Sequence, residues 1–325
     1  MQHLLLDNLP SPIINNPLLP LVSIVTPSYN QGKFIRATIE SVLTQDYPNI
    51  EYWVIDGGST DETISILKEY EHDQRFHWIS EPDQGQSDAI NKGLSRCRGE
   101  IFSWLNSDDC LLPQALQRVA AAWNAARQPL IIYGLVRLID QDGNDLGYCP
   151  LQSRSITLDT LLWCENQPIQ PATFVPTDYV RKMGGVNISL NYAMDLDLWI
   201  KLLEHLPIQY ISHDLALFRL HTTSKSVALP RKFINDHTEI FNQCVQRGLL
   251  SERQARSRVH LFAAKVYLMP GIGDFQAALS NLKISIANDY EALPKAMFVL
   301  IKGVIRLIVG EKLWAQVRFF KTQMG

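Results

Sequence analysis

An apolar run at residues 101–105 ends on the polar cluster Asn106-Ser107-Asp108-Asp109, whose two adjacent carboxylates could do chemistry. A run of this length indicates a buried parallel strand, and ligand sites in open α/β sheets lie beyond the carboxyl ends of such strands. Adjacent carboxylates repel each other unless a cation or hydrogen-bond donors neutralise them. Their hard oxygen atoms suit Mg²⁺ or Mn²⁺ bridging to phosphates, while a turn that caps the next helix explains the same residue types.

A second acid, Asp56, follows another predicted strand at residues 50–55. The two glycines after it favour a tight turn, and Ser59 with Glu62 has the spacing of a capping box that opens a helix at Thr63. Capping accounts for those residues. It leaves Asp56 unexplained, because an acid placed directly after a buried strand has no part in the cap.

A third pair of acids, Asp195 and Asp197, lies in the first turn of a helix predicted at residues 194–202. The helix dipole favours acids at this place in any protein, so dipole complementarity and catalysis both explain the pair. Because the two acids are two residues apart, they point to different faces of the helix, and only one of them can reach a substrate. A single histidine, His221, follows the last predicted strand, where a packed or capping role is the ordinary alternative to metal binding.

These residues need a fold that brings strand ends together. Strands predicted at 21–27, 50–55, 76–80 and 101–105 alternate with helices, which is typical of a doubly wound, mostly parallel sheet flanked by helices. Strands that end in polar clusters place those clusters on one rim of the sheet. A hairpin around Gln141-Asp142-Gly143 and short strands at 208–211 and 215–220 follow. Four further helices are predicted, at 233–247, 252–268, 274–288 and 295–321.

The composition is that of a globular protein, since 46% of the 325 residues are hydrophobic and 19% are charged. The formal net charge of −3 gives no reason to expect nucleic acid as a partner. Five scattered cysteines without a CxxC spacing indicate reduced thiols in a cytoplasmic protein. The proline-rich start lacks the features of a signal peptide, and no window has the roughly 18 uncharged apolar residues of a membrane span.

Five motifs resemble, in order and spacing, those of family 2 glycosyltransferases of the GT-A fold. They are Val25-Thr26-Pro27-Ser28-Tyr29-Asn30, Asp56-Gly57-Gly58-Ser59-Thr60-Asp61, Asn106-Ser107-Asp108-Asp109, Met194-Asp195-Leu196-Asp197-Leu198-Trp199 and Arg219-Leu220-His221. The resemblance covers residues 21–226. It divides the chain into a proline-rich leader at 1–20, a GT-A catalytic domain at 21–226 and an all-helical C-terminal extension at 227–325.

The resemblance implies a nucleotide-sugar donor, with UDP as the expected nucleotide. The residues it places on the nucleotide are Pro27, Tyr29, Asn30, Asp56, Asn106 and Ser107, with Asp56 accepting a hydrogen bond from a base imide such as uracil offers. Asn106-Ser107-Asp108 stands where the family keeps an Asp-x-Asp motif, and Asn106 departs from that pattern. An amide still bonds to a ribose hydroxyl. The implied cofactor is Mn²⁺ or Mg²⁺ at a site made by Asp108, Asp109 and His221.

Asp195 matches the second residue of the family's Glu-Asp motif, the general base, and Met194 departs from the first. The resemblance implies that Asp195 takes the proton of an acceptor hydroxyl as its oxygen attacks the anomeric carbon, so one displacement inverts that centre. Gln170, Thr173 and Asp197 are predicted on the acceptor side, with Asp197 alternatively a partner for a nearby cation. The expected acceptor is a saccharide or a lipid-linked molecule in the synthesis of a cell-surface polysaccharide or glycan.

Two other classes of protein compete with this prediction. A sugar nucleotidyltransferase needs a glycine-rich basic loop after the first strand, whereas residues 28–33 hold one glycine and one lysine. A non-catalytic nucleotide-sugar binding or scaffold protein is suggested by the departures at Asn106 and Met194. The retained acids and His221 argue against it, and an absence of donor hydrolysis would favour it.

Residues 295–321 combine basic side chains with bulky apolar ones, which suits a helix lying in a membrane interface. The alternative is a final helix packed on the catalytic domain. If the helix lies in a membrane interface, the chain is a cytoplasmic protein that contacts the inner face of a membrane peripherally, where it meets a lipid-linked acceptor.

Overall fold

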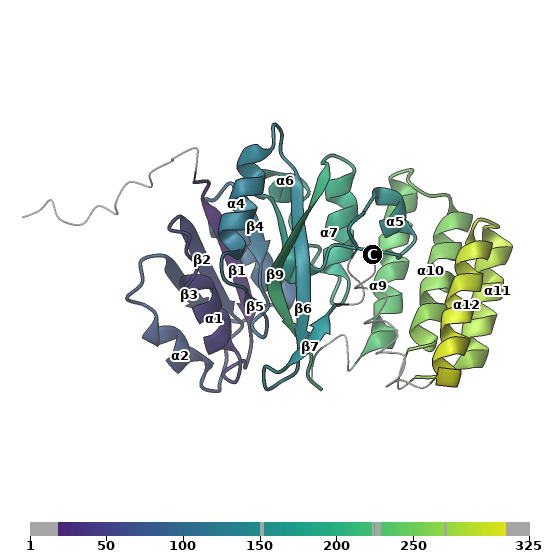
Figure 1. Ribbon diagram of the computed structural model, residues 1–325, viewed down its shortest axis with the longest axis horizontal. Helices are drawn as coiled ribbons and strands as arrows, with labels where there is room; N and C mark the ends of the chain where they lie inside the picture. Colours follow the sequence, from purple (N-terminus) through teal and green to yellow (C-terminus); the bar gives the residue numbers. More distant parts are fainter. Residues whose placement is uncertain (1–18, 150–152, 223, 225–228, 270–271, 310–325) are drawn as a thin grey trace, which may run out of the picture.

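A mixed β-sheet forms the centre of the molecule in the computed structural model, with helices on both of its faces (Figure 1). The structure describes residues 19–149, 153–222, 224, 229–269 and 272–309. Within them the strand order is β3-β2-β1-β4-β8-β6-β9-β5, and β7 pairs with β6.

The first half of the sheet is parallel, as the alternation of strands and helices predicted. It contains β1 (Val22–Ser28), β2 (Ile50–Asp56), β3 (Phe76–Ser80) and β4 (Ile101–Trp104), connected through α1 (Ile35–Leu43), α2 (Thr63–Glu69) and α3 (Gln86–Arg96). β1 and β4 are buried along their whole length, as expected for interior parallel strands. The register pairs Ser28 with Asp56 and Asp56 with Ser80, so the carboxyl ends of three strands meet at one rim.

The second half of the sheet adds antiparallel strands, so the sheet as a whole is mixed. β8 (Thr173–Pro176) runs antiparallel to β4 and to β6 (Ile131–Ile139). β9 (Ile208–Arg219) is parallel to β6 but antiparallel to the short β5 (Cys110–Leu111). β7 (Asp145–Tyr148) closes the predicted hairpin.

β9 is one strand where the sequence predicted two. Its pairing with β6 shifts register between Tyr133 and Val136, so the polar residues near Asp214 form a bulge without ending the strand. The two-residue β5 has no sequence signal of its own, because so short a strand shows no periodicity.

Two apolar cores lie on opposite faces of the sheet. One packs α1, α2 and α4 (Ala115–Ala125) against it. The other packs α3, α5 (Leu158–Leu162), α6 (Thr177–Lys182) and α7 (Met194–Leu203) against it. Short 3-10 turns occur at Gln170–Ala172 and Pro230–Lys232. After α6 the chain turns at Gly184 and Gly185, whose φ angles of 82° and 78° lie in the left-handed region that glycine favours.

The C-terminal helices are α9 (Phe233–Gln246), α10 (Glu252–Tyr267), α11 (Phe275–Asn288) and α12 (Ala292–Val309), and Figure 1 shows them as successive layers at one end of the sheet. α9 shares a core with α7 through Ile240, Phe241 and Cys244. α10, α11 and α12 form a smaller core of their own around Trp163. The last predicted helix extends to 321, and its part beyond 309 lies outside the described residues.

No helix among the described residues combines the length and apolarity needed to cross a membrane.

Candidate active site

The loops after β1 and β2 are joined to each other at the rim of the sheet. The Asn30 amide donates to Ser59 Oγ at 2.7 Å, and its Oδ1 accepts from the Thr60 amide at 2.9 Å. The Gly32 amide donates to Asp61 Oδ2 at 2.9 Å. Asn30 has a φ of 52°, a left-handed conformation that asparagine tolerates better than most residues. Asn30 is therefore the residue that ties the two loops together.

Asp56 lies at the end of β2 and is fully buried. Its Oδ2 accepts from the amides of Gly58 at 3.0 Å and Ser59 at 2.8 Å and from Ser80 Oγ at 2.7 Å. Its Oδ1 accepts from Ser59 Oγ at 2.5 Å. Such charge-assisted bonds compensate the desolvation of a buried carboxylate, so Asp56 holds the shape of its own loop.

The capping box predicted from Ser59 and Glu62 does not form, because the Ser59 hydroxyl is turned to Asp56. Asp61 takes part in opening the helix instead, since its Oδ1 accepts from the Thr63 amide at 3.0 Å.

Asn106, at the end of β4, bonds in both directions. Its Oδ1 accepts from Gln86 Nε2 at 2.7 Å, and its Nδ2 donates to Asp109 Oδ2 at 3.1 Å. An aspartate at this position would bring a carboxylate beside Asp109, where no donor would separate the two charges. The contacts with Gln86 and Asp109 therefore favour asparagine over aspartate at position 106.

Asp109 is fully buried beneath the rim. Its Oδ1 accepts from the Arg219 amide at 2.9 Å, and its Oδ2 from Asn106. Burial first, and the nearby Asp108 carboxylate second, raise the pKa of Asp109 well above its ordinary value. In this placement Asp109 bonds to its neighbours, and its role as a metal ligand stays a prediction. Ser107 is also buried, and its carbonyl accepts from Thr38 Oγ1 at 2.9 Å.

Asp108 reaches the rim with 22% of its side chain exposed, and its Oδ2 lies 2.9 Å from His221 Nε2. The His221 ring packs against Phe34 at 4.9 Å between centroids. The structure thus brings together the predicted metal residues Asp108 and His221. Among the described residues, no group of three or more His, Cys, Asp or Glu side chains is arranged to hold a metal ion.

Arg219 connects the segments around Asp108 and His221, a role that its sequence motif alone does not indicate. Its Nε donates to the Asp108 carbonyl at 2.9 Å, its Nη1 to the Asp140 carbonyl at 3.1 Å, and its guanidinium lies 5.2 Å from the Phe34 ring centroid. A single buried side chain therefore connects β9 to the backbone that carries Asp108.

Asp195 lies in the first turn of α7, where its Oδ1 accepts from the Leu196 amide at 2.9 Å. Burial raises the pKa of Asp195 to about 6, and the carboxylate of Asp236 acts in the same direction. At neutral pH this acid is mostly ionised yet holds a proton more readily than an exposed aspartate, which suits a general base.

The stacked pair Trp104 and Trp199 joins the two halves of the site. Their ring centroids lie 5.5 Å apart with an interplanar angle of 19°. The pair packs β4, which leads to Asp108, directly against α7, which carries Asp195.

Three predicted acceptor residues lie below the surface. Asp197 is fully buried on another face of α7, where its Oδ2 accepts from Lys201 at 2.6 Å. It is thus the partner of a nearby cation, as the alternative prediction had it. Thr173 is 1% exposed and donates to the Ile169 carbonyl. Both side chains are buried in this structure, and their acceptor role stays a prediction. Gln170 is 8% exposed, with Nε2 bonded to the Trp104 carbonyl and an Oε1 that has no partner among the described residues.

Known glycosyltransferases are similar to this chain in sequence. A sequence profile described as "Glycosyl transferase family 2" matches residues 23–167. The chain is 32% identical over 236 residues to an uncharacterized glycosyltransferase of Rickettsia felis, covering 70% of this chain and 38% of that relative. It is 30% identical over 236 residues to chondroitin synthase of Escherichia coli, covering 70% of this chain and 33% of that relative.

Solved structures share the fold at low sequence identity. S. aureus TarS 1-349 in complex with UDP-GlcNAc has a TM-score of 0.61 and 17% identity, covering 93% of this chain and 92% of that one. The mannosyltransferase PcManGT from Pyrobaculum calidifontis, in complex with GDP-Man and Mn²⁺, has a TM-score of 0.57 and 16% identity, covering 96% and 88%.

The fold is that of the GT-A class. The chain belongs to glycosyltransferase family 2. It spans 38% and 33% of the length of the two relatives named above.

Proposed function

We propose that this chain is an inverting glycosyltransferase that moves a sugar from a UDP-sugar to a hydroxyl of a saccharide or lipid-linked acceptor. The observation that carries the proposal is Asp195, an acid with a pKa raised to about 6 on a helix packed against the strand that leads to Asp108.

The donor nucleotide would bind along the rim formed by Pro27, Tyr29, Asn30, Asp56, Asn106 and Ser107. The Tyr29 side chain is 61% exposed and free to lie against a base. A base imide would bond to Asp56 Oδ1, which accepts a hydrogen bond from the Ser59 hydroxyl and has acceptor capacity left for a second. The complex of TarS with UDP-GlcNAc supports a uridine nucleotide by analogy of fold.

Asp108 and His221 would hold Mn²⁺ or Mg²⁺. One carboxylate and one imidazole leave several positions for the diphosphate and water, as such ions require, and Asp108 reaches the rim while Asp109 stays beneath it. When bound, the ion would neutralise charge on the departing nucleoside diphosphate. The manganese complex of PcManGT supports this choice of ion.

In the reaction, Asp195 accepts the proton of the acceptor hydroxyl as that oxygen forms a bond to the anomeric carbon. The bond from this carbon to the β-phosphate oxygen breaks on the opposite face, and the electron pair leaves with the nucleoside diphosphate. An α-linked donor therefore gives a β-linked product.

Two departures from the family pattern suggested a non-catalytic binding or scaffold protein, and one of them has a structural explanation. Asn106 departs from the family pattern, but its amide donates to Asp109 and accepts from Gln86, so the departure is explained by local contacts. We therefore propose a working enzyme.

Calorimetric titration of UDP in the presence of Mn²⁺, and then of chelator, tests the donor site. Wild type should bind with Mn²⁺ and lose most of its affinity with chelator, and Asp108→Asn should bind weakly under both conditions. The matched control Asp178→Asn changes an exposed acid on α6 and should bind as wild type does. Metal-independent binding, or equal binding by Asp108→Asn, would contradict the proposed metal site.

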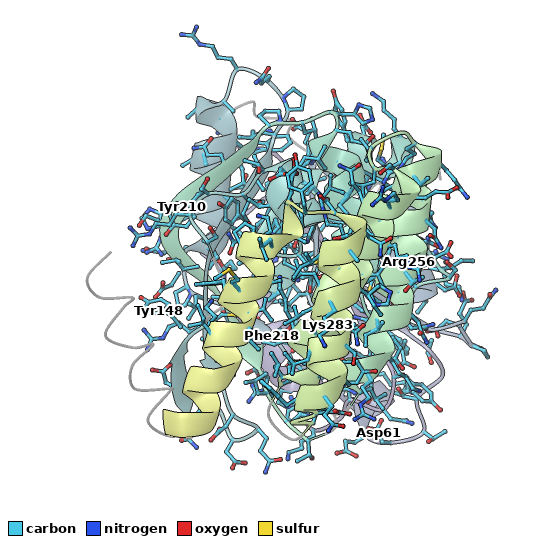
Figure 2. The ribbon with its side chains drawn as sticks, turned by 90° about the vertical axis from the view of Figure 1, so that its right-hand side faces the viewer. Asp61, Tyr148, Tyr210, Phe218, Arg256 and Lys283 are labelled. Atoms are coloured by element: carbon cyan, nitrogen blue, oxygen red, sulfur yellow. The ribbon has the colours of Figure 1, made fainter. Side chains whose placement is uncertain are left out.

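We also propose that the cytoplasmic enzyme meets a lipid-linked acceptor at an anionic membrane surface through α12. The inner face of α12 packs on α10 and α11, while its outer face exposes Leu293, Met297, Phe298 and Ile301. Figure 2 looks onto this end of the molecule, where α11 and α12 form the outermost layer. Lys302 lies 4.0 Å from the Phe298 ring centroid, and basic residues beside apolar ones suit anionic lipid.

Flotation with vesicles of phosphatidylglycerol and phosphatidylcholine tests this contact. The double variant Met297→Ser, Phe298→Ser should lose most of its vesicle binding and keep its UDP affinity. The exposed control Leu146→Ser, on β7, should bind vesicles as wild type does. Equal flotation of the double variant and wild type would exclude this face as the membrane contact.

A further inference from the structure

Asp236, on α9, makes an unusual contact with the segment that precedes α7. One oxygen, Oδ2, accepts from three successive backbone amides: Asn191 at 3.0 Å, Tyr192 at 2.6 Å and Ala193 at 3.0 Å. The side chain is buried, with 8% exposed. Successive amides that converge on one oxygen form a nest, a strong site for an anion.

This contact lies directly before α7, a helix that has no capping side chain of its own. The first amides of a helix have no partner within the helix, and a side chain at the N-cap position usually satisfies one of them. The N-cap of α7 is Ala193, which has no such side chain. Asp236 bonds instead to the N-cap amide and the two amides before it, and so places from another helix a negative charge at the start of α7, where the helix dipole favours one.

The same segment is held from its other side by α3. Ser87 Oγ donates to the Leu190 carbonyl at 3.0 Å. Asn91 bonds twice to Val186, with Nδ2 donating to the carbonyl at 2.7 Å and Oδ1 accepting from the amide at 2.8 Å. The chain that leads into α7 is thus fixed between a helix next to the donor rim and a helix of the C-terminal extension.

We propose that Asp236 is a positioning residue for the reaction: by holding residues 191–193 it fixes the start of α7 and the direction of the Asp195 carboxylate. The inference rests on the proposed role of Asp195. Misplacing a reacting group by about 1 Å costs on the order of a hundredfold in rate, so one buried contact outside the site can control turnover.

The charges around this contact are few among the described residues. Lys232 lies 6.0 Å from the ring of Tyr192. Burial lowers the pKa of His237 to about 4, so that ring, stacked on Phe262, is neutral at pH 7. The ion pair of Asp197 and Lys201 occupies another face of α7. Asp236 is therefore the carboxylate that disfavours ionisation of Asp195.

The test compares Asp236→Ala and Asp236→Asn with the control Asp289→Ala. Asp289 pairs with Arg258 at 2.7 Å, and both side chains are buried in the extension away from α7. The control therefore removes a buried acid from the same helical region without touching residues 191–193.

Release of UDP from UDP-GlcNAc and hydrogen exchange of the amides at 191–193 are measured for each folded variant. Asp236→Ala should lower kcat by about tenfold to a hundredfold, leave UDP affinity unchanged and speed exchange at 191–193. Asp236→Asn can still accept the three amides, so it should keep the slow exchange and most of kcat while the acid limb of the pH profile moves to lower pH. Asp289→Ala should match wild type in kcat and at 191–193.

Unchanged exchange at 191–193 and unchanged kcat in Asp236→Ala would overturn the inference, as would an equal loss in Asp289→Ala. Failure of the proposed function gives a different result from failure of the inference about Asp236. In that case wild type releases no UDP, or Asp195→Asn releases it as fast as wild type, whatever Asp236 does to exchange.

Discussion

The donor rim and the base-bearing side of the site are held in different ways. At the rim, Asp56 finds its partners at 58, 59 and 80, close in sequence or on the adjacent strand. On the other side, the segment before Asp195 depends on Asp236, which lies on a helix outside the sheet. The rim is built by the sheet itself, whereas the segment before Asp195, the proposed base, is bonded to a helix outside the sheet.

The largest effect should come from Asp195→Asn, which removes the base but keeps an acceptor for the Leu196 amide. We expect turnover to fall by about 10²–10⁴-fold, the usual contribution of general base catalysis, with UDP affinity unchanged. Rate measurements with saturating donor check this. A variant within a factor of two of wild type would remove Asp195 from the mechanism.

The same variant should be more stable than wild type at neutral pH. A folded-state pKa of about 6 lies above the unfolded value near 3.9, so ionised Asp195 opposes folding by up to about 3 kcal/mol. The advantage of Asp195→Asn is complete above about pH 6 and vanishes below about pH 4, where both states of wild type are protonated. Urea unfolding at pH 8 and pH 4 measures it, and equal stability at pH 8 would contradict the raised pKa.

Arg219→Lys should have the next largest effect, now on the donor side. Lysine cannot bond at once to the carbonyls of Asp108 and Asp140. We expect UDP affinity with Mn²⁺ to fall about tenfold. The free energy of unfolding should fall by about 2 kcal/mol, because two hydrogen bonds are lost. Calorimetry and urea unfolding test both. Unchanged UDP binding would mean that Asp108 is positioned without Arg219.

Asn106→Asp tests whether the departure from the family motif suits this chain. It would place a carboxylate against buried Asp109 in place of a donor, and we expect a loss of about 2 kcal/mol at neutral pH. Asn187→Asp is the control and should lose much less, because its side-chain oxygen still accepts from the Ser189 amide and hydroxyl. If Asn106→Asp were as stable as wild type and bound UDP more tightly, our explanation of Asn106 would be wrong.

The smallest effect on activity should come from Asp197→Asn. Its carboxylate is buried against Lys201 on another face of α7. We expect kcat within about threefold of wild type and a stability loss of about 1–3 kcal/mol from the weakened buried pair. A loss of turnover as large as that of Asp195→Asn would indicate that Asp197, and not Asp195, is the general base.

Much of the rim could be predicted from the sequence because a carboxylate directly after a buried strand is a local pattern. The end of β4 and the position of Asp56 follow that pattern, and the parallel strands β1 to β4 follow from the period of apolar residues. The opposite faces of α7 for Asp195 and Asp197 follow from helix geometry alone.

The rest depends on contacts between distant residues. β9 was predicted as two strands because a bulge near Asp214 interrupts its apolar pattern. Burial of Asp109 and Thr173 cannot be inferred from residue type, since both types are usually exposed. Asp236 has no local signal, because its three partners lie more than 40 residues away.

The pH dependence of turnover tests the central claim most directly. Initial rates of UDP release from UDP-GlcNAc, measured from pH 4.5 to 8.5 with saturating Mn²⁺, should rise with pH through an apparent pKa of about 6, the value of Asp195. A rate that stays flat from pH 4.5 to 8.5 would contradict a general base with that pKa and the account built on it.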